Sequence, residues 1–336
     1  MNNTYPLSQR LRPALLAVAL LLAPALAQAQ AQAKPNLAPW PTKALKIIVG
    51  FPAGSTPDLV ARTIAAPLSK ALGQPVLVEN RVGAGGNVAA DAVAKATDDH
   101  TIGVLINGNL TIAKILNPRL PFDPATDFAP IGLIATAPLV LAVPADAPGG
   151  DAKAFFDAAR AAGDKWSYGS VGVGSIGHIG TELLKAKTKV NPVHIPYAGN
   201  PQVITALIGG QVHMSLLPPG LAAAQVRAGK LRAIAVTSSG RSPLAPELPS
   251  LSEIGVTGIQ LEIWNAVAAP ASMPKHVVAK LSALVSEIVR SPEIRPQLFQ
   301  QGWQVVGANA EGLANRIKSD TAMLSAVIQA QGIKLE

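Results

Sequence analysis

The chain of 336 residues contains no cysteine. Disulfide bridges, catalysis by a thiol, thiolate metal ligands and a lipid-modified cysteine are therefore excluded. The fold must be stabilised by core burial alone. About 300 residues follow the first 33, which is enough for two ordinary domains.

Aromatic residues are scarce, at 4% of the chain, although the formal net charge is +8. Nucleic-acid-binding proteins usually combine a dense basic stripe with stacking aromatics. No run of Lys and Arg here reaches five residues. We therefore expect no nucleic acid partner, and small anions are the better match to the positive charge.

Long apolar runs are also lacking. The longest, residues 14–26, has about 13 residues, fewer than the roughly 18–20 that span a bilayer. Arg10 and Arg12 precede this run, and A-x-A sequences follow it at 25–27 and 31–33. Although a membrane anchor is the alternative, this order predicts a secretory signal peptide over 1–33, cleaved after Ala27 to Ala33. The mature protein is expected in the periplasm.

Strand and helix patterns alternate after residue 41, and the Pro- and Gly-rich segment 144–150 separates two such series. This rhythm predicts an α/β fold of two lobes, each a mostly parallel sheet flanked by helices. A further strand and two closing helices, with Pro274 and Pro292 in their first turns, are expected at the C-terminal end. The expected strands lie at 45–49, 75–79, 101–106, 166–170, 193–196, 212–217, 231–237 and 260–268.

Ligands of parallel α/β sheets bind beyond the carboxyl ends of strands, beside helix N-termini that favour anions. The first such turn, residues 51–58, follows the strand 45–49. Gly54 permits close approach to the backbone, and Ser55 and Thr56 offer uncharged hydroxyl donors. A plain helix cap explains Ser55, Thr56 or Asp58 equally well.

The second turn, residues 170–178, is rich in glycine and serine. Its Gly172, Gly174 and Gly177 have the spacing of a dinucleotide-binding fingerprint. That fingerprint also needs an acidic residue about 20 residues later, and none occurs near 194–197. A glycine-lined anion site is therefore preferred to a dinucleotide site, and no cofactor is expected.

The third turn, residues 196–200, contains Tyr197 as a candidate aromatic wall and Gly199 as a candidate backbone contact; an ordinary turn is the alternative. The surrounding region is basic, since no Asp or Glu occurs between Glu182 and Glu247. Such a field attracts anions, although these side chains can equally form a solvated surface.

Motifs for catalysis and metal binding are missing. The histidines at 100, 178, 194, 213 and 276 are scattered, without the H-E-x-x-H spacing of a zinc site, so no metal is expected. Neither Ser175 nor Ser170 lies in G-x-S-x-G. His178 remains a candidate pocket residue, and no enzymatic activity is expected.

Several motifs occur in a fixed order and resemble the receptor family of the tripartite tricarboxylate transporters, also called the Bug family. The resemblance extends from about residue 40 to the C-terminus. The matching segments are 46–62 (KIIVGFPAGSTPDLVAR), 78–87 (VENRVGAGGN), 168–178 (YGSVGVGSIGH), 193–199 (VHIPYAG), 207–212 (LIGGQV), 229–238 (GKLRAIAVTS), 241–243 (RSP), 248–250 (LPS) and 269–270 (AP).

The resemblance implies a type II periplasmic binding protein, a Venus flytrap whose lobes comprise residues 34–136 plus 257–336 and residues 137–256. It implies a monomer that captures a small anionic organic solute for an inner-membrane permease of two subunits. Neutral donors would hold the ligand carboxylates. The expected ligand-binding residues are Phe51, Ala53, Gly54, Ser55, Thr56, Asp58, Ser170, Gly174, Ser175, His178, Tyr197, Gly199 and Leu217.

Three positions depart from the family pattern. Ser55 stands where a second glycine is usual, and Pro57 is uncommon at its position. Near Leu217 and Pro218 an acid or another polar residue is often found, which could pair with a ligand ammonium group. Its absence here predicts a dicarboxylate, a tricarboxylate or an aromatic acid. Two alternatives remain: a signalling receptor with the same fold, and an exported hydrolase that uses Ser175 and His178.

Overall fold

The computed structural model describes residues 39–333, so the expected signal peptide lies outside the described residues. The chain divides into two units, Met1–Trp40 and Pro41–Glu336, and the fold below is that of the second unit. In the part of the chain that the structure describes, no helix is long and apolar enough to cross a membrane.

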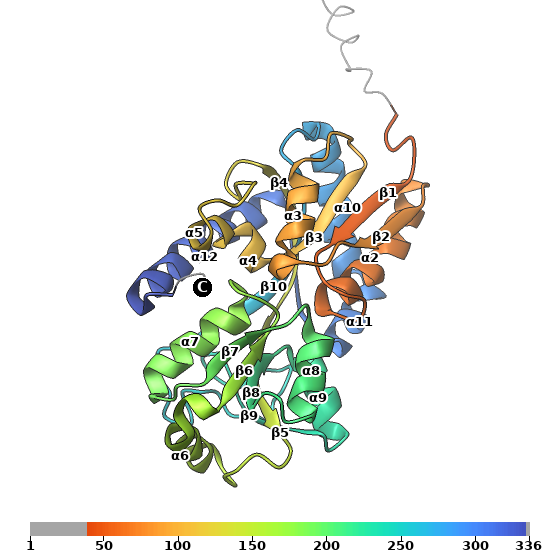
Figure 1. The fold of residues 1–336 in the computed structure, drawn as a ribbon. Coiled ribbons are helices and arrows are strands. Elements are labelled where there is room, and N and C mark those ends of the chain that lie inside the picture. Colours follow the sequence, from red (N-terminus) through yellow and green to blue (C-terminus); the bar gives the residue numbers. More distant parts are fainter. Residues whose placement is uncertain (1–38, 334–336) are drawn as a thin grey trace, which may run out of the picture. The chain divides into compact units, whose positions relative to one another are not determined.

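The first lobe, in the upper part of Figure 1, is built on a sheet with the strand order β11-β4-β10-β3-β1-β2. Its inner strands are apolar and buried on both faces, as sheets covered by helices on both sides require. The strands are β1 (Leu45–Val49), β2 (Val76–Asn80), β3 (Thr101–Ile106), β4 (Phe128–Pro138), β10 (Glu262–Pro270) and β11 (Gln304–Ala308).

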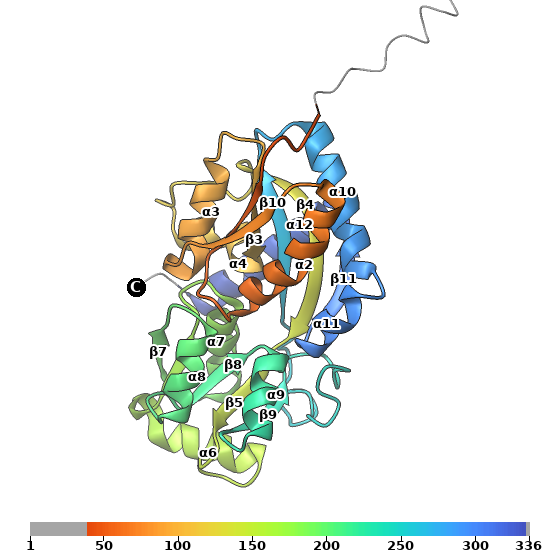
Figure 2. The same ribbon diagram turned by 90° about the vertical axis from the view of Figure 1, so that its right-hand side faces the viewer.

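Helices cover both faces of this sheet, with α3 and α10 on opposite sides in Figure 2. The core beneath α3 includes Ile48, Leu105 and Trp264. The helices are α2 (Thr56–Leu72), α3 (Asn87–Ala94), α10 (Lys275–Arg290), α11 (Ile294–Gln300) and α12 (Ala310–Gln331), with short turns α4 (Asn107–Leu110), α5 (Ala113–Leu116) and η2 (Ala84–Gly86).

The second lobe has a sheet with the order β7-β6-β8-β5-β9. Its strands are β5 (Val140–Pro144), β6 (Ser167–Ser170), β7 (Val193–Pro196), β8 (Met214–Leu217) and β9 (Leu231–Val236). Its helices are α6 (Ala152–Ala162), η3 (Gly163–Lys165), α7 (Ile176–Thr188), α8 (Asn200–Ile208) and α9 (Pro219–Arg227). One core cluster contains residues of α6 and α7, and another contains residues of α8 and α9.

Both sheets are mixed, which corrects the expectation of mostly parallel sheets. Strand β1 is parallel to β2 and β3, and β6 is parallel to β7 and β8, but the remaining pairs are antiparallel. The cause is the connection between the lobes. The chain leaves the first lobe along β4, which leads into β5 (Figure 2), and re-enters it along β10, so β4 and β10 run in opposite directions.

The C-terminal region also differs from the expectation of two closing helices. After β10 the described chain forms three helices, α10, α11 and α12, with strand β11 between the last two. Helix α12 has 22 residues and reaches both lobes. Leu313 packs in the core of the first lobe, whereas Leu324 and Ile328 belong to a core cluster of the second.

Candidate functional site

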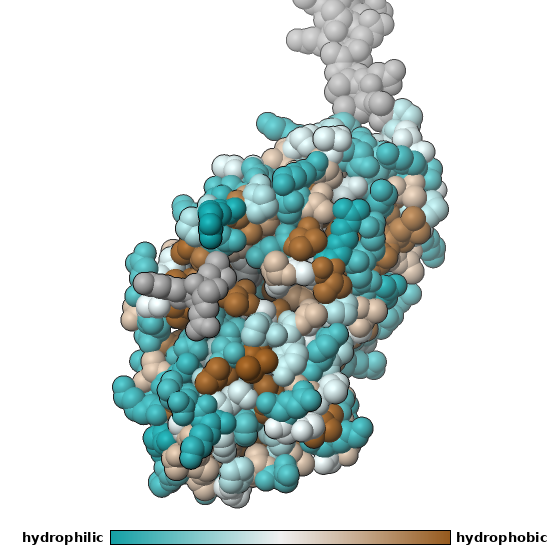
Figure 3. All heavy atoms as spheres, in the orientation of Figure 1, coloured by the Kyte–Doolittle hydropathy of each residue, from teal (hydrophilic) through white to brown (hydrophobic). Residues whose placement is uncertain are grey.

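A cavity of about 50 Å³ lies between the two lobes. The first lobe lines it with the start of α2, the end of β3 and the middle of β10. The second lobe lines it with the turns after β6, β7 and β8. These are the strand-to-helix turns where α/β proteins bind ligands. The surface outside has only scattered apolar groups on the face shown in Figure 3.

The first turn leads from β1 into α2, and Ser55 is the N-cap residue of this helix. Its side chain makes no capping hydrogen bond. Its Oγ atom is buried, unpaired, and belongs to a residue that lines the cavity. The helix-cap alternative therefore does not account for the Ser55 hydroxyl. Thr56 lines the cavity too, and the free N–H groups of the first α2 turn lie beside it.

Asp58 stabilises the conformation of this turn. Its carboxylate accepts hydrogen bonds from the Gly54 backbone N–H at 3.0 Å, from Asn80 Nδ2 at 2.9 Å and from Arg62 Nε at 3.0 Å. Burial alone would raise the pKa of Asp58, but the hydrogen bonds from Arg62, Asn80 and Gly54 together outweigh it and lower the pKa. Asp58 is therefore an ionised residue that positions the loop.

The second turn leads from β6 into α7. Ser170 and Ser175 line the cavity, and both hydroxyls donate to the carbonyl of Gly172, at 3.1 and 2.8 Å. Ser175 caps α7 by accepting the His178 backbone N–H at 3.3 Å. Gly172 and Gly174 have positive φ angles, which glycine adopts without strain. The turn thus aims the N-terminus of α7 at the cavity.

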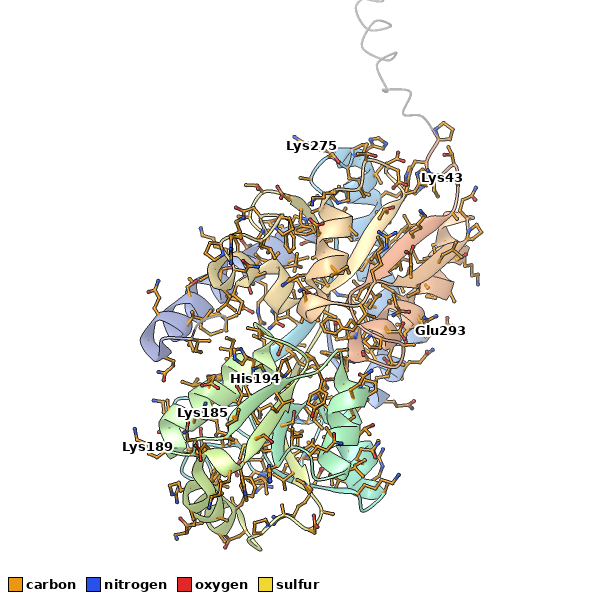
Figure 4. All side chains as sticks on the ribbon, viewed as in Figure 1. Lys43, Lys185, Lys189, His194, Lys275 and Glu293 are labelled. Carbon is orange, nitrogen blue, oxygen red and sulfur yellow. The ribbon has the colours of Figure 1, made fainter. Side chains whose placement is uncertain are left out.

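Behind Ser170 lies a stack of rings. His194 Nε2 is 2.7 Å from Ser170 Oγ, and the His194 ring stacks on those of His178 and Tyr168. Figure 4 places His194 towards the middle of the structure and Lys189 at its edge. Burial, followed by the nearby His178, lowers the pKa of His194 from 6.5 to about 4, despite the opposing effect of Glu182.

This depressed pKa predicts an acid-sensitive fold. Below about pH 6.5 the unfolded chain takes up a proton, whereas folded His194 stays neutral down to about pH 4. The stabilising contribution is therefore complete above pH 6.5 and is lost as the pH falls towards 4. Between pH 7 and pH 5 we expect a loss on the order of 1–2 kcal/mol, reduced by the partial exposure of the ring.

Urea unfolding at the two pH values measures this loss, and the His194→Gln variant should lack it. The matched control is His276→Gln, which changes an exposed histidine on α10 and should retain the pH dependence of the parent protein. Full pH dependence in the His194→Gln variant would contradict the assignment.

The third turn leads from β7 into α8 and touches the first turn across the cavity. Gly199 approaches so closely that an added Cβ would lie 2.8 Å from both Pro52 Cδ and Ser55 Oγ. Asn200, the first residue of α8, reaches Thr56 Oγ1 at 3.5 Å through its side-chain amide. The lobes therefore meet here through small groups.

The structure brings together five of the expected site residues: Phe51, Ser55, Thr56, Ser170 and Ser175 line the cavity. The other expected residues surround it. Ala53 and Gly54 are exposed, Asp58 and His178 support the turns, and Gly199 lies against Pro52. Gly174 and Tyr197 line a neighbouring cavity of about 440 Å³, and Leu217 packs in the core of the second lobe.

Sequence reasoning missed two buried asparagines of the lining, Asn107 and Asn265. Asn107 directly follows β3, so its position at a strand end was a usable signal. Asn265 interrupts the apolar strand β10, where an amide is unusual. Trp303, which also lines the cavity, lies between α11 and β11 in the part of the chain where the expected elements were wrong.

The lining of the cavity contains no ionisable side chain. The labelled Lys43 and Lys275 lie at the far end of the first lobe (Figure 4). The N-termini of α2, α7 and α8 begin at lining residues, and their N–H groups favour negative charge. Within residues 39–333, no group of three or more His, Asp or Glu could hold a metal ion.

The sequence model of the tripartite tricarboxylate transporter family receptor matches residues 60–333. The chain belongs to this family. A UPF0065 protein from the tcbD–tcbE intergenic region of Pseudomonas sp. (strain P51) is 36% identical over 85% of each chain. BugT of Bordetella pertussis is 29% identical, covering 88% of this chain and 92% of that one.

Solved structures agree with this tricarboxylate-receptor assignment. MatC of Rhodopseudomonas palustris with bound malate has a TM-score of 0.82 at 32% identity, covering 86% of this chain and all of that one. A second R. palustris protein, solved with adipate, has a TM-score of 0.85 at 32% identity, covering 88% and 99%. The periplasmic binding protein BugD has a TM-score of 0.84 at 31% identity, covering 88% and 100%.

These matches confirm the family and the two-lobed α/β fold. The family and its structural neighbours are receptors that bind substrates, not enzymes. The hydrogen bond between Ser175 and His178 is a helix cap, in which the backbone N–H of His178 donates to Ser175 Oγ. This contact does not support the hydrolase alternative.

Proposed function

We propose that this receptor binds a small organic carboxylate in the periplasm and delivers it to an inner-membrane permease of two subunits. The observation that carries the proposal is the convergence of three helix N-termini on a cavity whose lining contains no ionisable side chain. Backbone N–H groups there can hold a carboxylate without a buried cation. The malate and adipate of two structural neighbours are of this chemical class.

The ligand is further proposed to lack an amino group. A ligand ammonium group would need a carboxylate partner, and none lines the cavity. At the position where the family often has an acid, Leu216 and Pro218 form apolar lining. A dicarboxylate, tricarboxylate or aromatic acid fits this surface better than an amino acid.

We also propose that residues 34–136 with 257–336 and residues 137–256 act as the two lobes, which close on the ligand about β4 and β10. The lobes touch through glycines that line the neighbouring cavity of about 440 Å³. An added Cβ on Gly108 would lie 2.6 Å from the Gly174 carbonyl oxygen, and one on Gly172 would lie 2.9 Å from Gly85 Cα. Backbones can meet this closely only where side chains are absent.

A thermal-shift screen of the mature, refolded monomer tests the function. Ligand at 100 times its Kd should stabilise the protein by about 2.7 kcal/mol, which raises the Tm by roughly 5–10 °C. We expect shifts with carboxylates, smaller or no shifts with amino acids and sugars, and full recovery of the added acid. No shift with any carboxylate, or conversion of the acid, would refute the proposal.

A further inference from the structure

Two buried asparagines in the cavity lining have polar atoms without partners. Asn265 is fully buried, and neither its Oδ1 nor its Nδ2 makes a hydrogen bond. Asn107 is 1% exposed, and its Oδ1 is likewise unpaired. Buried amides are nearly always hydrogen-bonded, because a lost hydrogen bond to water must be replaced. Three unpaired atoms at one place therefore indicate a partner from outside the chain.

The orientation of the Asn107 amide is determined by its neighbour. Its Nδ2 donates to the Glu262 backbone carbonyl at 3.0 Å, so its Oδ1 is the free end and can only accept a hydrogen bond. Asn265 has both ends free and offers a donor beside an acceptor.

The sheet register brings the backbone positions of the two asparagines close together, and both side chains line the same small cavity. Asn265 on β10 is paired with Ile106 on β3, and Asn107 is the next residue after Ile106. Both asparagines belong to the first lobe, where Trp264 and Ile263 provide apolar lining next to them. The two side chains thus form one polar patch in a largely apolar wall.

We infer that Asn107 and Asn265 form a subsite for a ligand group that donates a hydrogen bond, a hydroxyl above all, so that the solute is a hydroxylated carboxylate. This inference rests on the proposed function and specifies its ligand class. A hydroxyl group can donate to Asn107 Oδ1 while it accepts from Asn265 Nδ2. An ionised carboxylate only accepts hydrogen bonds, so it would leave the Asn107 acceptor unpaired.

Nearby asparagines show what a structural role looks like in this fold. Asn109, two residues beyond Asn107, donates to the Gly85 carbonyl at 3.0 Å and to Asn87 Oδ1 at 2.9 Å, and its own Oδ1 accepts the Ile106 N–H. Both the oxygen and the nitrogen of the Asn109 amide are therefore hydrogen-bonded within the first lobe. The Asn265 side chain makes no such hydrogen bonds, so a structural role like that of Asn109 does not explain why an asparagine occurs in β10.

Matched pairs of acids test the inference on the refolded mature protein by titration calorimetry. The probes are malate against succinate, citrate against tricarballylate, and 4-hydroxybenzoate against benzoate. In whichever pair binds, the hydroxylated member should bind at least about tenfold more tightly, because a site built to bond a hydroxyl discriminates against its loss.

Equal binding within every pair that binds would overturn the inference and leave carboxylate binding intact, since an ordered water would then satisfy Asn107. If none of the six acids bound and a carboxylate without a hydroxyl group shifted the Tm, the inference would fail while the proposed function stood. No shift with any carboxylate would remove both.

The Asn265→Leu variant provides a second readout. A near-isosteric apolar side chain removes unpaired polar atoms, so the Tm of the ligand-free variant should not fall, while the preference for the hydroxylated acid should drop towards onefold. The control Asn109→Leu removes an amide whose oxygen and nitrogen are both hydrogen-bonded and should lower the Tm by roughly 2–8 °C. A comparable fall in Asn265→Leu would show a structural asparagine and overturn the inference.

Discussion

Replacing Gly220 with alanine is expected to weaken ligand binding about ten- to a hundredfold while the fold is retained. Gly220 is the second residue of α9 in the second lobe, and its backbone lies against Gln301 and Gly302 of the first. The added Cβ would meet the Gln301 carbonyl oxygen more closely than real Cβ atoms do. Overpacking costs typically 1–3 kcal/mol, and each 1.4 kcal/mol is tenfold in affinity.

The clash should be confined to the closed arrangement of the lobes. Gly220 has no positive φ angle, and alanine is a better helix former than glycine, so the second lobe by itself tolerates the change. Calorimetry with the acid that stabilises the parent protein most measures the affinity. The control Gly150→Ala adds a Cβ where no heavy atom lies within 4 Å and should bind as the parent does.

Two results together would contradict the closure proposal: a loss of stability of the Gly220→Ala variant without ligand, and a ligand affinity equal to that of the parent protein. The contact between Gly220 and Gly302 would then belong to a rigid connection between the lobes. Pro218 lies two residues before Gly220, and Trp303 directly follows Gly302. Both line the cavity, so a shift of either backbone would also reach the site.

Replacing Asp58 with alanine is expected to cost about 3 kcal/mol of folding free energy, or roughly 6–12 °C in Tm. The carboxylate is 1% exposed and accepts hydrogen bonds from Gly54, Arg62 and Asn80. Without it, the Gly54 N–H loses its acceptor and the first turn loses its support. Ligand affinity should fall as well, because Ser55 and Thr56 are positioned by the same turn.

The pH dependence separates this effect from a simple packing defect. The pKa of Asp58 is lowered on folding, so its stabilising contribution is present above the ordinary value of 3.8 and is lost as the pH falls through the folded pKa. Thermal unfolding of parent and variant should therefore differ at pH 7 and converge in strong acid. A constant difference at all pH values would contradict the role of the charge.

The exposed Asp157 on α6 supplies the control. Its ion pairs with Lys153 and Arg160 are formed by solvent-exposed side chains, which contribute little to stability. The Asp157→Ala variant should unfold at the temperature of the parent protein.

The local patterns of the sequence were sufficient for most individual elements. Strands β1, β3 and β7 have the expected bounds. These segments alternate cleanly between apolar runs and Gly, Pro or Ser turns, so each is decided by its own residues. The C-terminal region was less predictable, because β11 is a short strand flanked by longer helices.

The sequence by itself determined most of the elements, the family and the position of Ser55, Thr56, Ser170 and Ser175 at or beside the turns at strand ends. Only the tertiary structure decided that Asn107 and Asn265 stand side by side, since β3 and β10 are separated by more than 150 residues and meet only by sheet pairing. It also decided that Asp58 bonds to Gly54, Arg62 and Asn80 instead of lining the cavity, and that glycines of the two lobes meet. Pairing between strands so far apart depends on where the chain re-enters the first lobe after the second. Local sequence patterns do not predict that position.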